Sequence, residues 1–399
     1  MSEILNFTEA ESKLDGRFSR LELIEWWDQP RLANAHVVVI GAGALGNELL
    51  KNLALLGIGN VFIADLDLIE NSNLSRSILY RAADCGRKKS EVAAERAREI
   101  YPEMKTQSFH GNVVYDLGQG IYRWADVILG GLDNREARVS INRGAARAGR
   151  VWIDGAIERL DGVARVFDPA IGPCYECTMS EIDWKMLEAR RSCALLTREE
   201  MVQGKVPTTP TTASVVAGIQ IQEAIKLLHG LPTLSGQGFV FDGLHHQSYT
   251  VTYTRLADCP SHEADNPVDV LPWRTTITTV RQFLDRVRSD LGADSVIEVN
   301  NDLLEGLTCE KCGITEPFLA SLGKVTESQG KCPKCSENRT PQIYHTINGT
   351  EAFLDRTLFE IGVPLWDVIA GRRGLNQKFY EFGGDAPDVL GPLSARPVP

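Results

Sequence analysis

The sequence predicts an α/β protein with a mostly parallel sheet, followed by a smaller, cysteine-bearing module. Three observations carry this prediction. A strand, a glycine-rich turn, a helix and a second strand follow one another between His36 and Asp67; strands and helices keep alternating to about residue 170; and two Cys-x-x-Cys pairs lie beyond residue 300. Alternating strands and helices are typical of a parallel sheet that helices cover.

The glycine-rich turn has the context of a Rossmann-like nucleotide-binding unit. Four branched apolar residues, 37–40, run directly into a G-x-G-x-x-G turn at Gly41, Gly43 and Gly46, and a helix and a second strand ending at Asp65 follow. In such units the glycines allow a tight turn, the approach of a phosphate and close helix packing. The helix N-terminus would face the anion, and Asp65 lies where a ribose hydroxyl would be held.

Composition excludes several classes of protein. The chain has 399 residues, enough for two or three domains, and 42 Lys+Arg against 53 Asp+Glu give a net charge of −11, which argues against a nucleic-acid-binding surface. No apolar run approaches membrane-spanning length, and the N-terminus lacks the pattern of a signal peptide. We therefore expect a cytoplasmic protein that binds neither nucleic acid nor membrane. Because the cytoplasm keeps thiols reduced, the 9 cysteines indicate metal binding or catalysis instead of disulfides.

The pattern divides the chain into four parts. Residues 1–35 are expected to form a helical arm, residues 36–265 the α/β domain, and residues 266–385 the C-terminal module. Residues 386–399 are proline-rich and are expected to be a disordered tail. Within the α/β domain, residues 178–212 show little periodicity and are expected to form a crossover loop.

Charged and polar side chains follow successive strands of the expected sheet. Asn73 and Arg76 come after the second strand, Lys89 follows them, and Asp133 comes after a buried strand at 126–129. Open α/β sheets bind ligands at the carboxyl ends of their strands. Two cations that face phosphate oxygens, with a carboxylate that holds Mg²⁺, suit a nucleoside triphosphate and its metal.

These motifs together resemble the ThiF/MoeB/ubiquitin-activating enzyme superfamily over roughly residues 15–262. The matching elements are an R-x-x-R arm, the glycine turn, a D-x-D, an N-L-x-R, a lysine and a D-N after a strand. They fall here at Arg17 to Arg20, Gly41 to Gly46, Asp65 to Asp67, Asn73 to Arg76, Lys89, and Asp133 with Asn134. Two positions depart from the pattern: Ala44 replaces a usual glycine, and Ser77 replaces a usual glutamine.

The resemblance implies a Rossmann-like adenylation domain that uses ATP and Mg²⁺ to activate the C-terminal carboxylate of a ubiquitin-like β-grasp protein. The glycine turn, with Ala44, and Asp67 would border the nucleotide. The other implied roles are ribose binding for Asp65, phosphate binding for Asn73, Arg76 and Lys89, Mg²⁺ binding for Asp133, and, for Arg20, reaching across a homodimer to the other protomer's triphosphate.

Four residues are expected to form a first zinc site. Cys174 and Cys177 make one C-x-x-C, and the family pairs such a motif with a second one after the catalytic domain. The nearby match is a C-x-x-H at Cys259 and His262. We therefore expect a Cys₃His site with histidine as the fourth zinc ligand.

A second structural zinc is expected in a ribbon at residues 305–340. Two C-x-x-C pairs lie there, with their inner cysteines 20 positions apart, at Cys309, Cys312, Cys332 and Cys335. This is zinc-ribbon spacing. Pairing between the two cysteine modules stays open from the sequence. The module that carries the ribbon could dock a conjugating enzyme, dock the modifier, or stabilise the chain.

The sequence leaves two cysteines over. Cys85 reads as an ordinary small residue, whereas Cys193 lies in the crossover loop next to Arg190 and Arg191, whose charges favour a thiolate. In ubiquitin-type activators the thioester-forming cysteine comes from this loop. We therefore expect Cys193 to be the nucleophile.

The predicted reaction is adenylation of the modifier, thioester formation on Cys193 and transfer to a separate conjugating partner. One alternative is a sulfur-carrier protein adenylyltransferase that yields a thiocarboxylate; no rhodanese-like segment is evident, which favours conjugation. An NAD(P)-dependent oxidoreductase would leave Arg76, Lys89 and Asp133 without a shared purpose. Intact Lys89 and Asp133 also argue against an inactive scaffold.

Overall fold

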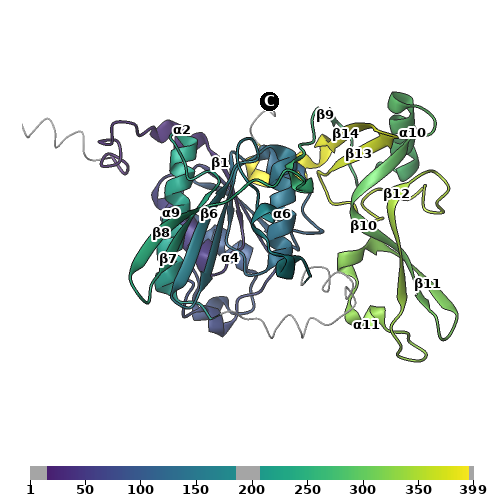
Figure 1. The fold of residues 1–399 in the computed structure, drawn as a ribbon, viewed down its shortest axis with the longest axis horizontal. Helices are drawn as coiled ribbons and strands as arrows, with labels where there is room; N and C mark the ends of the chain where they lie inside the picture. The colour runs from purple at the N-terminus through teal and green to yellow at the C-terminus, as the bar shows by residue number, and fades with distance from the viewer. Residues whose placement is uncertain (1–15, 186–206, 395–399) are drawn as a thin grey trace, which may run out of the picture.

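The computed structural model describes residues 16–185 and 207–394, which form two parts side by side (Figure 1). The first part is built on an eight-stranded sheet with the order β3-β2-β1-β4-β5-β6-β7-β8. Its strands are β1 (His36–Ile40), β2 (Asn60–Asp65), β3 (Lys105–His110), β4 (Val127–Gly130), β5 (Trp152–Glu158), β6 (Asp161–Phe167), β7 (Gln237–Asp242) and β8 (Gln247–Thr252).

The order of the strands creates a ligand-binding position. Strands β3, β2, β1, β4 and β5 run parallel, and β6, β7 and β8 extend the sheet in antiparallel fashion. The prediction of a mostly parallel, Rossmann-like sheet is confirmed. The chain order reverses between β1 and β4, and such a switch point is where open α/β sheets bind ligands.

Helices cover both faces of the larger sheet (Figure 1). The covering helices are α3 (Ala44–Leu55), α4 (Lys89–Ile100) and α9 (Pro210–Leu228) on one face, and α5 (Gly120–Trp124) and α6 (Arg135–Ala148) on the other. Side chains of β1 alternate between the faces, as the pleat requires: Val37 and Val39 belong to one core, and Val38 and Ile40 to the other. Both cores close the sheet off from water, which explains the continuous apolar run in β1.

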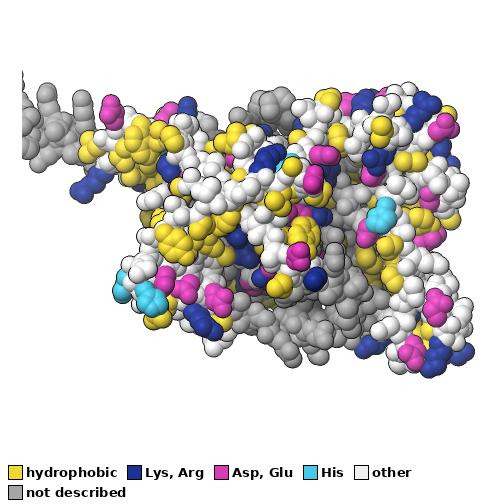
Figure 2. Space-filling model, viewed as in Figure 1, with side chains coloured by type: hydrophobic (Ala, Val, Ile, Leu, Met, Phe, Trp, Pro, Cys, Tyr) yellow, Lys and Arg dark blue, Asp and Glu magenta, His cyan; other side chains and the backbone are white. Residues whose placement is uncertain are grey.

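Within its described residues, the N-terminal arm is less helical than predicted. Residues 16–27 form successive turns, and between residues 16 and 35 only α2 (Gln29–Asn34) is an α-helix. Pro30 lies in the first turn of α2, where its missing N–H costs nothing, but a proline interrupts any helix that runs through it. Exposed apolar side chains gather on the arm next to α2 (Figure 2), among them Leu23 and Trp26.

The second part is a smaller sheet packed on one helix. Its order is β11-β10-β13-β14-β9, with β12 paired to β10. The elements are β9 (Val268–Leu271), α10 (Val280–Leu291), β10 (Val296–Cys309), β11 (Ile314–Ser321), α11 (Glu327–Gly330), β12 (Thr340–Ile347), β13 (Val368–Arg373) and β14 (Asn376–Phe382). Phe283 of α10 packs edge-on against Tyr380 and Phe382 of β14 in the centre of its core.

The two parts meet along α6. Arg147, in the last turn of α6, donates from Nε to the carboxylate of Asp265, at 2.9 and 3.0 Å, and from Nη1 to Oδ1 of Asn300, at 2.8 Å. Arg123 of α5 donates to Glu381 of β14 at 2.7 Å. The C-terminal module is therefore fastened to the larger sheet by charged pairs on both sides of the junction.

The expectation of a disordered tail from residue 386 is wrong for its described part. Residues 386–390 form α12 (Ala386–Leu390), and a 3₁₀ turn follows it. Ala386, Leu390 and Leu393 are each no more than 6% exposed and join a core of the larger sheet. Proline content suggested disorder, but these apolar side chains share one face, and Pro387 fits the first turn of a helix.

None of the described helices combines the length and the apolar composition that crossing a membrane requires.

Candidate functional site

The glycine turn joins β1 to α3 at the switch point of the larger sheet. Gly41 has a φ of +94°, and a Cβ there would overlap the carbonyl oxygen of Gly131, which follows β4. A Cβ on Gly46 would overlap the carbonyl oxygen of Gly41, whereas a Cβ on Gly43 would meet no atom of the described residues within 4 Å. The fold itself therefore requires Gly41 and Gly46. Gly43 instead leaves open space in front of the N-terminus of α3, which begins at Ala44.

Asp65, at the end of β2, holds this turn together. One carboxylate oxygen accepts a hydrogen bond from the backbone N–H of Ala42 and the other from that of Asp67, both at 2.7 Å. Burial raises the pKa of Asp65 above its usual 3.8, and the charge of Lys89 and the two backbone donors oppose this rise only in part. The residue expected to bind a ribose thus also fixes the backbone of the glycine turn.

Lys89 and Asp67 form an ion pair beside the turn. The Lys89 side chain is 11% exposed, and its Nζ lies 2.7 Å from a carboxylate oxygen of Asp67. A buried ammonium next to the glycine turn, at the first residue of α4, can neutralise a phosphate. In the structure the carboxylate of Asp67 supplies a negative charge beside this ammonium.

Two buried polar side chains of this cluster were missed by the sequence interpretation. Nδ2 of Asn47 donates to the carbonyls of Ala42 and Gly43, at 2.8 and 3.0 Å, and its Oδ1 accepts from the N–H of Leu79 at 2.9 Å. The hydroxyl of Tyr80 lies 2.6 Å from the carbonyl oxygen of Ala42. An asparagine among the leucines of α3 is the signal that could have revealed the first. Both side chains tie the segment after β2 to the glycine turn.

Asn73 and Arg76 lie on this segment but are engaged locally. Oδ1 of the buried Asn73 accepts from the N–H of Glu70 at 2.9 Å. The half-buried Arg76 donates from Nη1 to the carbonyl oxygen of Ser72 at 2.8 Å, in a hydrogen bond that is open to solvent. Asn73 keeps its amide donors available for a ligand, and the single solvent-exposed carbonyl contact of Arg76 is easily exchanged for a phosphate.

Asp133 follows β4, the neighbour of β1 across the switch point. Its side chain is exposed and makes no hydrogen bond or ion pair with the residues that the structure describes. A carboxylate of this kind is the oxygen donor that Mg²⁺ prefers. The chemistry of the residue therefore fits a Mg²⁺ ligand, and its place after β4, which runs parallel to β1, sets it at the same end of the sheet as the glycine turn.

Arg20 is exposed on the N-terminal arm, and no hydrogen bond or ion pair connects it to the rest of the described chain. Its neighbour Phe18, by contrast, packs edge-on against Tyr101 and anchors the arm. The arm is thus fixed while its second arginine faces away from its own core.

The structure brings the four residues of the first expected zinc site together. The ligand atoms of Cys174, Cys177, Cys259 and His262 all lie within 4.8 Å of one another. The sulfur atoms of Cys174 and Cys259 are 3.5 Å apart, and Sγ of Cys177 is 3.2 Å from Nε2 of His262. Ligands at about 2.3 Å from a tetrahedral zinc have similar spacings.

Glu176, between the two cysteines of the first pair, links this cluster to α6. Its buried carboxylate accepts from Nδ2 of Asn142 at 3.0 Å and from Nη2 of Arg143 at 2.7 Å, both on α6. It also accepts from the hydroxyl of Ser261, which lies between Cys259 and His262. The same carboxylate thus fastens both halves of the metal cluster to one helix.

The ribbon cysteines form the second group. Cys309, Cys312, Cys332 and Cys335 also place their ligand atoms within 4.8 Å of one another, and the sulfur atoms of Cys309 and Cys335 are 3.6 Å apart. The pairing that the sequence left open is thereby decided, because each group forms within its own module. Both groups have the donor set of a structural zinc site.

The remaining cysteines belong to neither group. Cys85 is exposed. Cys193, the expected nucleophile, lies outside the described residues.

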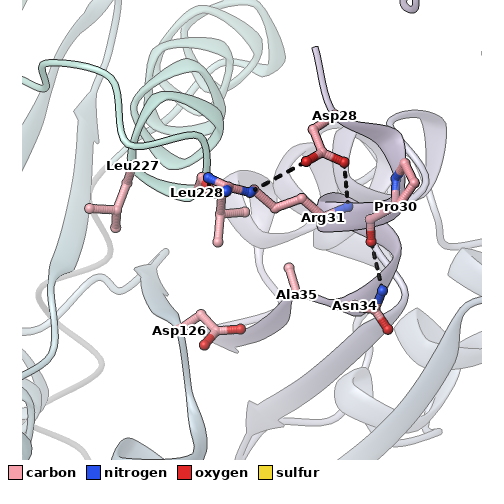
Figure 3. Close-up of a pocket in the computed structure, with 8 residues that line it drawn as sticks. All are labelled: Asp28, Pro30, Arg31, Asn34, Ala35, Asp126, Leu227 and Leu228. Atoms are coloured by element: carbon pink, nitrogen blue, oxygen red, sulfur yellow. Dashed lines mark hydrogen bonds and ion pairs between the residues drawn. The ribbon is translucent and has the colours of Figure 1, made fainter. Parts of the chain in front are cut away.

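A pocket of about 540 Å³ lies at the end of the strands opposite to the end that carries the glycine turn. Figure 3 shows the residues that line it. It opens between α2 and the end of α9, and its lining includes Asp28, Arg31, Asp126 and Leu228. Asp28 and Arg31 pair with each other across α2, with Nε and Oδ2 3.6 Å apart. Asp126 precedes β4, so this pocket borders the amino ends of the strands and is separate from the cluster at the switch point.

The family model of the ThiF family matches residues 17–261, more than half of the chain. This chain belongs to the ThiF family. The resemblance that the motifs indicated is confirmed. The matched segment contains the glycine turn, both candidate cations of the site, Asp133 and the three cysteines of the first candidate zinc site, and it ends one residue before His262.

Relatives of this ThiF family chain include activators of two kinds. A sulfur carrier protein adenylyltransferase of Thermus thermophilus is 32% identical over 238 residues, covering 58% of this chain and 83% of the relative. The SAMP-activating enzyme E1 of Haloferax volcanii is 31% identical over 240 residues, covering 58% of this chain and 82% of the relative. The NEDD8-activating enzyme E1 catalytic subunit of Arabidopsis thaliana is 38% identical over 156 residues, covering 36% and 34%.

Among solved structures, E. coli MccB with ATP superposes with a TM-score of 0.52 and 22% sequence identity, covering 62% of this chain and 74% of MccB. At this identity the likeness supports the fold of the larger part alone. The segment matched by the family model ends at residue 261, before the C-terminal module begins.

Proposed function

We propose that this chain adenylates the C-terminal carboxylate of a small β-grasp protein with ATP and Mg²⁺. The observation that carries the proposal is the cluster at the switch point. An open space at Gly43 faces the N-terminus of α3, Lys89 lies buried beside it, and the unpartnered Asp133 follows the adjacent strand. Membership in the ThiF family and the adenylyltransferase and activating-enzyme names of the relatives favour a nucleoside triphosphate over a redox dinucleotide.

The proposed reaction needs little acid–base chemistry. The modifier's terminal carboxylate is already ionised, so an oxygen attacks the α-phosphorus directly and pyrophosphate leaves. Lys89 and Arg76 neutralise charge on the phosphates, and Asp133 holds the Mg²⁺, which stabilises the charge of the leaving group. Catalysis then consists of positioning and charge neutralisation.

We further propose that the chain works as a homodimer in the cytoplasm. Arg20 faces away from its own core on an arm that Phe18 anchors, and the same arm exposes Leu23 and Trp26 (Figure 2). Apolar side chains gathered on a surface often mark an interface. Arg20 would then reach the triphosphate of the second protomer.

The fate of the adenylate has two candidate outcomes. In the first, Cys193 attacks the acyl-adenylate, AMP leaves, and the thioester passes to a conjugating partner. In the second, a sulfur donor converts the adenylate into a thiocarboxylate, as the names of the Thermus relative and of a probable adenylyltransferase/sulfurtransferase of Mycobacterium tuberculosis suggest for those proteins. This chain spans 57% of the Mycobacterium protein.

We also propose that each cysteine cluster holds a structural zinc. The support is the donor set and spacing of each group. The ribbon would then stabilise the C-terminal module and present it to the modifier or to a conjugating enzyme.

The experiment that tests the proposal is ATP–pyrophosphate exchange with a candidate β-grasp protein. Exchange that depends on the modifier's intact C-terminus supports adenylation, and its absence with every β-grasp partner tried contradicts it. Cys193→Ala separates the two outcomes. It should retain exchange and lose a reductant-sensitive adduct if the thioester forms on Cys193, and an adduct that survives the change removes Cys193 from that role.

A further inference from the structure

The loop that carries Asp133 is fixed by hydrogen bonds to its backbone. Gly131 donates its N–H to the carbonyl oxygen of Ile40 at 2.8 Å, and Nε2 of Gln220 donates to the carbonyl oxygen of Gly130 at 2.8 Å. The carbonyl oxygen of Leu132, directly before Asp133, accepts from Nη2 of Arg138 at 2.5 Å. The loop therefore owes its position to long side chains that come from elsewhere in the fold.

Arg138 connects this loop to the interior of the sheet. It lies in the second turn of α6, with a side chain only 10% exposed. Its Nε donates to Oδ1 of Asp154 on β5 at 3.0 Å, and Nη2 also reaches the carbonyl oxygen of Gly155 at 3.2 Å. A planar guanidinium can bind several acceptors at fixed angles, so Asp154 orients the same group that holds Leu132.

Asp154 has a second arginine partner, Arg165, which serves as a comparison residue for Arg138. Arg165 on β6 donates from Nε to Oδ2 of Asp154 at 3.1 Å and packs over the ring of Tyr175. Within the described residues, none of its side-chain hydrogen bonds reaches the loop 131–134. The two arginines thus share one buried carboxylate, and only Arg138 touches the loop.

We propose that Arg138 is a positioning residue that sets the carboxylate of Asp133 for Mg²⁺. This inference rests on the proposed use of Mg²⁺·ATP. Arg138 holds the carbonyl one residue before Asp133, and Asn134 one residue after it caps α6 by accepting from the N–H of Ala137 at 2.8 Å. Asp133 is fixed on both sides and remains unpartnered between them.

The test compares Arg138→Lys with Arg165→Lys in the full chain. Each variant keeps a positive charge beside Asp154, but a lysine at 138 cannot reach Asp154 and Leu132 together. Affinity for ATP is measured by calorimetry with Mg²⁺ and with EDTA, and pyrophosphate exchange is followed against Mg²⁺ concentration. Thermal unfolding and zinc content report on the fold.

We expect Arg138→Lys to weaken ATP binding in Mg²⁺ by about tenfold or more, as loss of a group that orients a metal ligand does. In EDTA the ATP affinity of Arg138→Lys should equal that of the unsubstituted chain. The ATP affinity of Arg165→Lys should equal that of the unsubstituted chain both in Mg²⁺ and in EDTA. A further supporting result is a raised Mg²⁺ requirement for exchange in Arg138→Lys alone. Equal losses in the two variants, or a loss for Arg138→Lys that persists in EDTA, would overturn the inference.

Folding failure of Arg138→Lys does not end the test. Arg138→Gln combined with Asp154→Asn leaves the net charge of the cluster unchanged, and Arg165→Gln combined with Asp154→Asn is its matched control. The same contrast between Mg²⁺ and EDTA is expected, and its absence overturns the inference. An unsubstituted chain that binds ATP equally in Mg²⁺ and EDTA also overturns it, whereas a chain that binds Mg²⁺·ATP but gives no exchange contradicts only the proposed function.

Discussion

Single residues of the site divide into those that the fold needs and those that only a ligand would need. Gly41 and Asp65 already have contacts within the protein. The backbone of Gly131 lies against Gly41, and the carboxylate of Asp65 accepts hydrogen bonds from two backbone N–H groups. Gly43 and Asp133 meet nothing comparable in the described chain. Substitutions should therefore separate stability from ATP binding.

Gly43→Ala and Gly41→Ala make the first contrast. The methyl group of an alanine at 43 contacts none of the residues that the structure describes but enters the space in front of α3. We therefore expect unchanged thermal unfolding and an ATP affinity lower by about tenfold, or about 1.4 kcal/mol. An alanine at 41 is strained at positive φ and overlaps Gly131, so stability should fall by about 1–3 kcal/mol or more. Calorimetry and chemical unfolding measure the two effects, and loss of stability in Gly43→Ala would contradict the assignment.

The buried Asp154 gives a prediction about pH. Burial raises its pKa, but the charges and hydrogen bonds of Arg138 and Arg165 outweigh burial and hold the pKa below its usual 3.8. A depressed carboxyl pKa contributes stability that is complete above the unfolded value and is lost as the pH falls through the folded value. Asp154→Asn should therefore cost about 3–5 kcal/mol at neutral pH. Its deficit should shrink below pH 3.8 in urea unfolding, and a deficit that stays constant there would count against the buried ion cluster.

At the scale of elements, α6 connects features that lie far apart in the sequence. Its cap, Asn134, follows the candidate Mg²⁺ ligand; Asn142 in its middle binds Glu176 of the metal cluster; and Arg147 in its last turn binds Asp265 at the module junction. A helix is stiff along its axis, so a displacement at one of these places is transmitted to the others. The adenylation site and the metal cluster therefore share one support.

The short α12 is an element whose removal should be costly. Ending the chain after residue 385 removes Leu390 and Leu393, which are 3% and 2% exposed, and their burial contributes about 1.5–3 kcal/mol each. For the two leucines together we expect the free energy of unfolding to fall by about 3–6 kcal/mol, as measured by chemical unfolding. A chain that ends after residue 394 keeps both leucines and serves as the control. Equal stability of the two truncated chains would show that α12 does not pack as described.

At the scale of the whole molecule, the two proposed zinc sites lie in different parts. The first joins the end of the larger sheet to α6, and the second closes the tip of the C-terminal module, away from the glycine turn. Loss of either zinc should therefore have distinct consequences.

We expect about two zinc ions per chain by elemental analysis, one for each cluster. Cys309→Ser should leave about one zinc and retain pyrophosphate exchange. Cys174→Ser should also leave about one zinc, but it should lower both stability and exchange, because Glu176 connects that cluster to α6. A content of one zinc in the unsubstituted chain would remove one site, and full exchange in Cys174→Ser would disconnect the first cluster from the active site.

Predictions from sequence succeeded where the signal was local. The strand, glycine turn and helix from His36 to Leu55 follow from apolar spacing and three glycines, and α10 follows from its amphipathic period. The cysteine groups follow from short spacings that a tetrahedral metal imposes. In the described part of the arm, residues 16–35, the turns before α2 were predicted as helix because Pro30 was not taken as a helix start. Residues 386–394 were predicted to be disordered from their proline content, although Ala386, Leu390 and Leu393 form an apolar stripe.

The sequence by itself determined the family, the nucleotide-binding turn and the two sets of cysteines, because each depends on residues close together or on a fixed order of motifs. Only the tertiary structure decided which cysteines pair, that Asp65 also holds the glycine turn, and that Arg138 reaches from α6 to the loop of Asp133. These contacts join segments on different strands and helices. Their partners are chosen when the faces of the sheet and helices pack, and no spacing along the chain encodes that choice.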